Sequence, residues 1–227
     1  MTITLARDAE EERTLLKGLK KLAATGLSLA IADGGSSKGF VKQVLDFNYF
    51  VVIPQEKGLV RQVKAGIAVA LRQFKDRRAI LYTEPDKSPF FEGRLLEFVK
   101  AAKSSEKMGV VAAARDEKSF RTFPEGQYRC EHFMNDAFSW IVKRRSDYCY
   151  GPLLLSRTAA KLALQSPDDL GWGWRFWTMK KAYESGLRVS TIEMDLPCPT
   201  EQRGEDSKHD RLYRLKQLKQ NLDSITR

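Results

Sequence analysis

Two carboxylates separated by one residue follow an apolar segment near the middle of the chain. Residues 79–83 read Ala-Ile-Leu-Tyr-Thr, which is typical of a buried strand, and Glu84-Pro85-Asp86 comes directly after them. Ligands of open α/β sheets bind outside the carboxyl ends of strands, and Mg²⁺ or Mn²⁺ is often held by one or two carboxylates together with substrate phosphates. Pro85 restricts Glu84 to an extended conformation that would aim it forward. The segment predicts either a metal and phosphate site or a solvated turn.

Two earlier segments also place chemically useful groups after strands. Asp33 and Gly34 open the turn Asp-Gly-Gly-Ser-Ser, which fits neither the Gly-x-Gly-x-x-Gly fingerprint nor a Gly-Lys-Ser/Thr phosphate loop. Asp33 would either accept hydrogen bonds from a base or ribose or cap the next helix. Lys57 and Gly58 precede a long helix, where Lys57 is either a cation beside a diphosphate or a solvated side chain, and Gly58 permits close backbone approach.

The later chemistry-bearing residues are a carboxylate pair and a histidine. Asp168 and Asp169 precede Gly-Trp-Gly-Trp at 171–174; they suit a general base or a group that orients acceptor hydroxyls. The alternative is an acidic helix start over an aromatic core, in which we expect Trp174 and Trp177. His209 lies in the polar segment 203–210, expected to be a mobile loop, and is either a metal or phosphate ligand or an exposed residue.

These residues are interleaved with alternating strand and helix signals. We expect a single α/β domain over 1–227 with a mainly parallel central sheet, flanking helices and a C-terminal amphipathic helix. Strands are expected at 2–5, 27–32, 49–53, 79–83, 108–113 and 187–194, with a further apolar stretch at 148–155. Helices are expected from 8 to 26, from 59 onward, and at 90–103, 131–143, 158–165, 174–184 and 211–222.

Composition narrows the setting and the partners. The 227 residues carry 39 Lys plus Arg against 29 Asp plus Glu, a formal charge of +10 that favours anionic partners. Three cysteines without a CxxC spacing favour a reducing, cytoplasmic setting. No segment approaches the roughly 20 apolar residues of a membrane span, although the basic C-terminal helix suits docking or peripheral contact with a membrane.

The order of these motifs resembles one family. Over residues 2–195 the chain is similar to the GT-A fold glycosyltransferases, especially family 2-like enzymes and relatives that make mannosylglycerate or glucosyl-phosphoglycerate. The resemblance implies donor-nucleotide contacts at Asp33 and Gly34 and donor-phosphate contacts at Lys57 and Gly58, although Glu56 replaces the family's first glycine. Further, it implies that Glu84-Pro85-Asp86 stands in place of the DxD motif. Metal binding would then fall to Asp86, Glu84 and His209, and the acceptor-side acids would be Asp168 and Asp169.

The expected function is transfer of a sugar from a nucleotide-diphosphate sugar to a hydroxyl group of a small molecule, glycan or lipid, with Mg²⁺ or Mn²⁺ as cofactor. Residues 1–115 would form the donor half, 116–200 the acceptor half, and 201–227 a C-terminal loop and helix. The alternative is a GT-A scaffold that has lost catalysis and serves as a nucleotide-binding or regulatory module. Binding of nucleic acid would suit the charge, but no recognition signature is present. Nucleotidyl transfer lacks the expected Gly-Thr-Arg loop.

Overall fold

The computed structural model describes residues 1–47, 49–53, 57–87, 89–103 and 108–227. Its strands are β1 (Thr2–Thr4), β2 (Ala30–Asp33), β3 (Phe50–Val52), β4 (Ala79–Tyr82), β5 (Met108–Arg115), β6 (Leu153–Ser156) and β7 (Arg188–Met194). Its α-helices are α1 (Ala9–Ala24), α2 (Lys38–Leu45), α3 (Leu59–Gln73), α4 (Leu95–Lys103), α5 (Glu117–Phe120), α6 (Glu125–Val142), α7 (Arg157–Ala163), α8 (Trp174–Glu184) and α9 (Lys208–Thr226). A short 3₁₀ segment, η2 (Asp168–Gly173), leads into α8.

Strands of one direction dominate the sheet. β1, β2 and β3 pair in parallel in the order β1-β2-β3, and the remaining strands pair in the order β4-β6-β5-β7. A parallel bridge between Thr2 and Thr83 connects β1 to the end of β4. β6 is antiparallel to both of its neighbours, and β5 is parallel to β7. All strands except β6 therefore run the same way, which confirms the predicted mainly parallel α/β sheet.

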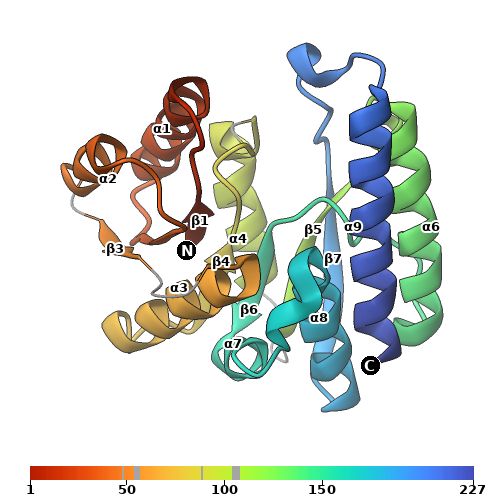
Figure 1. Cartoon of the computed structure of the whole chain (residues 1–227). Coiled ribbons are helices and arrows are strands. Elements are labelled where there is room, and N and C mark those ends of the chain that lie inside the picture. The colour runs from red at the N-terminus through yellow and green to blue at the C-terminus, as the bar shows by residue number, and fades with distance from the viewer. Residues whose placement is uncertain (48, 54–56, 88, 104–107) are drawn as a thin grey trace.

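Helices cover both faces of the sheet. Neighbouring residues of β2 face opposite sides: Ile31 packs in a core with α1, α2 and α4, and Ala32 packs in a core with α3, α6, α7 and α8. Such two-sided burial explains why the strands read as continuous apolar runs. In Figure 1, α1 and α2 lie beside β1–β3, and α6 and α9 lie side by side at the opposite end of the molecule.

Two helices begin earlier than the sequence predicts. α6 begins at Glu125, because Pro124 takes the N-cap position, where its missing N–H is no loss. α9 begins at Lys208, because Ser207 caps it and Asp210 completes a capping box. The predicted loop over 203–210 is therefore wrong for its last three residues, and His209 lies on a helix.

Asp8 caps α1 as predicted, with its side chain accepting hydrogen bonds from the N–H groups of Glu10 and Glu11. The amphipathic reading of α9 holds only for its second half: Leu218 and Leu222 pack against the core, but Leu212 and Leu215 are more than half exposed. No helix among the described ranges is long and apolar enough to cross a bilayer.

Candidate active site

A cavity of about 850 Å³ opens at the carboxyl ends of β1, β2 and β4. We call it the strand-end cavity. Its walls come from the loop after β1, the turn after β2, the start of α3 and the segment after β4, and include Leu5, Arg7, Gly34, Gly35, Lys57, Gly58, Gln62, Glu84, Pro85, Asp86, Trp172 and Tyr213. Five of the residues predicted from the sequence thus meet in one place: Gly34, Lys57, Gly58, Glu84 and Asp86. Another cavity of about 820 Å³, at the amino ends of β2 and β4, is lined by none of the predicted site residues.

Asp33 shapes this cavity without lining it. Its carboxylate is buried and accepts hydrogen bonds from the hydroxyls of Thr4 (2.9 Å) and Ser36 (2.6 Å) and from the N–H groups of Gly35 (2.9 Å) and Ser36 (2.8 Å). These bonds hold the turn that presents Gly34 and Gly35 to the cavity. The predicted alternative of a helix cap is wrong, because Ser37 caps α2. A direct contact between Asp33 and a nucleoside stays a prediction.

Gln62 is a buried residue of α3 that the sequence reasoning missed. Its side-chain amide donates to the carbonyl oxygens of Thr4 and, at 2.8 Å, Ala32, which ties together the ends of β1 and β2. A Cβ atom on Gly34 would lie 2.9 Å from the same amide nitrogen, so this position leaves little room for a side chain. In the sequence, Gln62 could have been noticed as a single polar residue on the apolar face of the helix that begins at Leu59.

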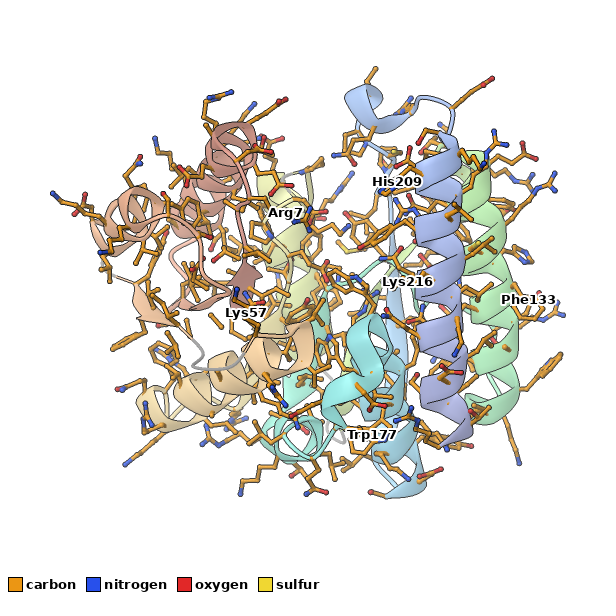
Figure 2. All side chains as sticks on the ribbon, in the orientation of Figure 1. Arg7, Lys57, Phe133, Trp177, His209 and Lys216 are labelled. Carbon is orange, nitrogen blue, oxygen red and sulfur yellow. The ribbon has the colours of Figure 1, made fainter. Side chains whose placement is uncertain are left out.

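The start of α3 is suited to an anion. Gly58 is its N-cap with φ 136°, and no side chain caps the helix. The N–H groups at this end, together with the helix dipole, favour negative charge, and the exposed Lys57 lies beside them on the cavity wall. Figure 2 shows Lys57 close to β1. Glu56, the departure from the family pattern, falls outside the described residues.

Glu84 and Asp86 differ sharply in environment. The Asp86 side chain is 52% exposed, and its carboxylate has Lys87 Nζ at 3.5 Å. Glu84 is buried, with Arg175 Nη1 3.8 Å from its Oε1, which has no hydrogen-bond partner among the described residues. Burial raises the pKa of Glu84, while Arg175 and Lys87 oppose that shift. Asp86 is thus available to a ligand in solution, whereas Glu84 is held inside the protein.

The predicted metal ligands do not converge. His209 is exposed on the first turn of α9 and does not line the strand-end cavity. Figure 2 places it at the end of α9, away from Lys57. Within the described ranges no three His, Cys, Asp or Glu side chains gather to hold one ion. Asp86 still offers the single hard oxygen ligand that Mg²⁺ or Mn²⁺ commonly combines with substrate phosphates.

Asp168 and Asp169 do not line the strand-end cavity. Asp168 accepts hydrogen bonds from Arg61 Nε (2.8 Å) and Lys64 Nζ (2.6 Å), and Asp169 accepts one from Arg227 Nη1 (2.9 Å). The bonds from Arg61 and Lys64 lower the pKa of Asp168, which weakens it as a base. The structure therefore does not bring this pair to the predicted site, and their catalytic role stays a prediction.

The Gly-Trp-Gly segment after them does reach the site. Trp172 lines the strand-end cavity, and its indole N–H donates to Tyr213 Oη on α9 at 3.1 Å. Cβ atoms on Gly171 and Gly173 would lie 2.5 and 2.3 Å from atoms of Gln220, so both glycines let α9 pack directly on η2. The expected core positions of the other tryptophans are confirmed, since Trp174 and Trp177 are buried.

A smaller cavity of about 250 Å³ adjoins the strand-end cavity and shares Glu84, Asp86, Trp172 and Tyr213 with it. We call it the basic cavity, because its wall carries four cations, Lys87, Arg115, Arg175 and Arg214, against three acids, Glu84, Asp86 and Glu131. One guanidinium nitrogen of each arginine is buried without a hydrogen-bond partner in the part of the chain that the structure describes: Nη1 of Arg115, Nε of Arg175 and Nε of Arg214. An unpartnered buried donor is costly unless a ligand satisfies it.

Arg115 is the most firmly held of these cations. Its Nε and Nη2 donate to Asp147 at 2.7 and 3.0 Å, Nη2 also donates to Glu131 at 2.6 Å, and the guanidinium lies 4.0 Å from the centre of the Phe120 ring. The arginines of the basic cavity were missed from the sequence. They come from β5, α8 and α9, and each reads locally as an ordinary charged residue.

The arrangement of strands and helices is that of the GT-A fold. No protein-family model matches the chain, and no curated protein matches it in sequence. Solved structures of glucosyl-3-phosphoglycerate synthase from Mycobacterium tuberculosis match it over 99% of its length.

For one of these structures the match covers 80% of the synthase chain, with a TM-score of 0.63 and 12% sequence identity. For a second, which contains Mn²⁺, UDP-glucose and phosphoglyceric acid, the match covers 79% of that chain, with a TM-score of 0.62 and 13% identity. For a third, which contains Mn²⁺, UDP-glucose and glycerol 3-phosphate, it covers 79% of that chain, with a TM-score of 0.60 and 13% identity. At this identity the likeness establishes the GT-A fold.

Proposed function

We propose that this protein transfers a hexose from a nucleoside-diphosphate sugar to a hydroxyl group of a small anionic acceptor. The observation that carries the proposal is the junction of the two cavities, where Glu84, Asp86, Trp172 and Tyr213 line both. Group transfer between two substrates requires that their reacting atoms be held in contact. A large cavity that shares four wall residues with a small basic one suits that arrangement, and the fold similarity to hexose transferases supports it.

The donor would occupy the strand-end cavity. Its volume of about 850 Å³ lies within the range of about 300 to 1,000 Å³ that is usual for ligand sites. Lys57 and the uncapped start of α3 would receive the diphosphate, with Gly58 allowing close approach. The nucleoside would lie against the turn of Gly34, whose shape Asp33 sets.

Asp86 would hold Mg²⁺ or Mn²⁺ together with the donor diphosphate. Such an ion supplies positive charge that stabilises a leaving diphosphate. Glu84 is better placed as a buried anion that orients Arg175 at the junction, 3.8 Å away. His209 lines neither cavity, so a metal contact from it would require this side chain to leave its present surroundings.

The acceptor would occupy the basic cavity. Its small volume and its four cations favour a compact acceptor with a phosphate or carboxylate group. The compounds in the similar solved structures, phosphoglyceric acid and glycerol 3-phosphate, carry such groups. In the reaction the acceptor oxygen would bond to the anomeric carbon as the bond from that carbon to the diphosphate oxygen breaks. Asp168 or Asp169 could take the acceptor proton only after its ion pairs open.

Thermal unfolding with a panel of nucleoside diphosphates, with and without Mn²⁺, tests the donor site. We expect one nucleotide to raise Tm in a Mn²⁺-dependent manner, and Asp86→Asn to abolish the Mn²⁺ dependence. Asp76→Asn is the matched control, since that side chain is 77% exposed and lines neither proposed substrate cavity. A lack of response to every nucleotide would refute the donor site.

A catalytically inactive nucleotide-binding module is the second candidate. It is favoured by the absence, among the described residues, of a cluster of metal-binding side chains. Incubation with the matching nucleotide sugar and a panel of phosphorylated hydroxy acids separates the two candidates. Nucleotide binding without release of nucleoside diphosphate or formation of a glycoside would establish the inactive module.

A further inference from the structure

The outer surface of α6 carries two aromatic side chains that the core does not cover. Trp140 is 81% exposed and Phe133 55% exposed. They lie seven residues apart and so share one side of the helix, while Met134 and Phe138 on the other side are buried. Figure 2 shows Phe133 at the outer edge of the molecule. Exposed aromatic residues that recur on one side of a helix indicate an interaction surface.

α9 extends this surface. It packs beside α6, as Figure 1 shows, and its Leu212 and Leu215 are 58% and 55% exposed. We define the α6–α9 face as the exposed side chains of both helices and of residues 143–145. Tyr213, which is 43% exposed on α9, lines the strand-end cavity and is left out of this face; the other exposed residues of both helices line neither of the proposed substrate cavities.

The charge of the α6–α9 face is strongly positive. Its exposed basic residues are Arg129, Lys143, Arg144, Arg145, Lys208, Arg211, Lys216 and Lys219. Four acids lie outside the cavity on the same helices: Glu125, Asp136, Asp210 and Asp223. Basic residues exceed acids by four. Two copies of such a face would repel each other, whereas an anionic surface would attract it.

From these observations we propose that the α6–α9 face docks on an anionic membrane surface. Tryptophan and phenylalanine enter the interfacial layer favourably, and lysine and arginine reach the headgroups around them. Trp140 stands next to Lys143, Arg144 and Arg145, which combines an anchor with a basic cluster. The proposal does not rest on the transferase activity.

Co-sedimentation with vesicles tests the docking. The probes are vesicles of phosphatidylcholine alone and of phosphatidylcholine with about one quarter phosphatidylserine, an anionic lipid typical of cytoplasmic leaflets. We expect the full chain to bind the anionic vesicles and to be released by high salt. The double variant Phe133→Ala with Trp140→Ala should bind on the order of tenfold more weakly or worse. Arg144→Glu with Arg145→Glu should have an effect of similar size.

Leu96→Ala is the control, because Leu96 is 50% exposed on α4, away from this face. It should bind as the unmodified protein does. All variants should keep the Tm of the unmodified protein, since the altered side chains are exposed. Absence of vesicle binding, equal binding to neutral vesicles, or unchanged binding by the aromatic double variant would each overturn the proposal. So would light scattering that shows a dimer which the aromatic double variant loses.

Discussion

Gly173 offers a direct test of how α9 is held against the active site. The backbone of Gly173 has ordinary dihedral angles, with φ −64° and ψ −16°, so alanine at this position is free of backbone strain. A Cβ atom there would lie 2.3 Å from the carbonyl oxygen of Gln220 and 2.8 Å from Cβ of Ser224. The helix would have to move away from η2. Gly173→Ala therefore measures the packing of α9 on η2 alone.

We expect this variant to lower the free energy of unfolding by about 1–3 kcal/mol, the usual cost of forcing an extra methyl group into a packed interior. For a chain of this length that corresponds to a fall in Tm of about 2–10 °C. Because Trp172 and Tyr213 line both cavities, movement of α9 should also weaken ligand binding. Urea denaturation and the nucleotide-dependent rise in Tm measure the two effects.

Gly39→Ala is the matched control. Gly39 lies on α2, and the nearest atom to its added Cβ would be Ser37 Oγ at 3.7 Å, an ordinary contact. Alanine favours a helix over glycine by about 1 kcal/mol, so this variant should be as stable as the unmodified protein or slightly more so. If Gly173→Ala proved as stable as Gly39→Ala, the close packing of α9 on η2 would be refuted.

Three further changes test other parts of the site. Gln62→Met removes the hydrogen bonds that join β1 to β2 and should lower the free energy of unfolding in urea by about 1–3 kcal/mol; an unchanged midpoint would contradict that role. Asp147→Asn removes one of the two carboxylate partners of Arg115. Burial alone would raise the pKa of Asp147, but the interaction with Arg115 lowers this pKa overall. The stability that the Asp147 carboxylate adds is therefore present above the unfolded pKa of about 3.9 and is lost as pH falls below that value. The stability difference between the unmodified protein and the variant should therefore shrink below about pH 4 in denaturation curves, and a constant difference would contradict the ion pair. Lys57→Ala should weaken nucleoside-diphosphate binding about tenfold in calorimetry. Lys38→Ala is the control and should leave binding unchanged, because Lys38 is exposed on α2 and does not line the strand-end cavity. Equal effects of the two variants would show that net charge alone is responsible.

Much of the fold could be predicted because its signals are local. Alternating apolar strands and amphipathic helices indicated a mainly parallel α/β sheet, and parallel strands bring their carboxyl ends to one edge. That rule alone placed Gly34 and Asp86 together, and the structure confirms that both line the strand-end cavity. The antiparallel direction of β6 was not predicted, because a four-residue apolar strand carries no mark of the direction in which it pairs.

The chemical partners of the site depended on the tertiary structure. Asp168 and Asp169 looked available in the sequence, yet their partners Arg61 and Arg227 are distant in the chain and meet them only in the fold. The basic cavity likewise combines β5, α8 and α9. Its existence depends on α9 packing against η2 and α6, a contact between segments far apart in the sequence.

The sequence by itself determined the approximate positions of the strands, the starts of α1, α3 and α8, and that Glu84 and Asp86 follow a buried strand, because period and capping act over a few residues. Only the tertiary structure decided that Asp86 stays exposed while Glu84 is buried beside Arg175, and that Asp168 is held in ion pairs. The reason is physical: burial and charge pairing are set by whichever groups the folded chain brings within a few ångströms.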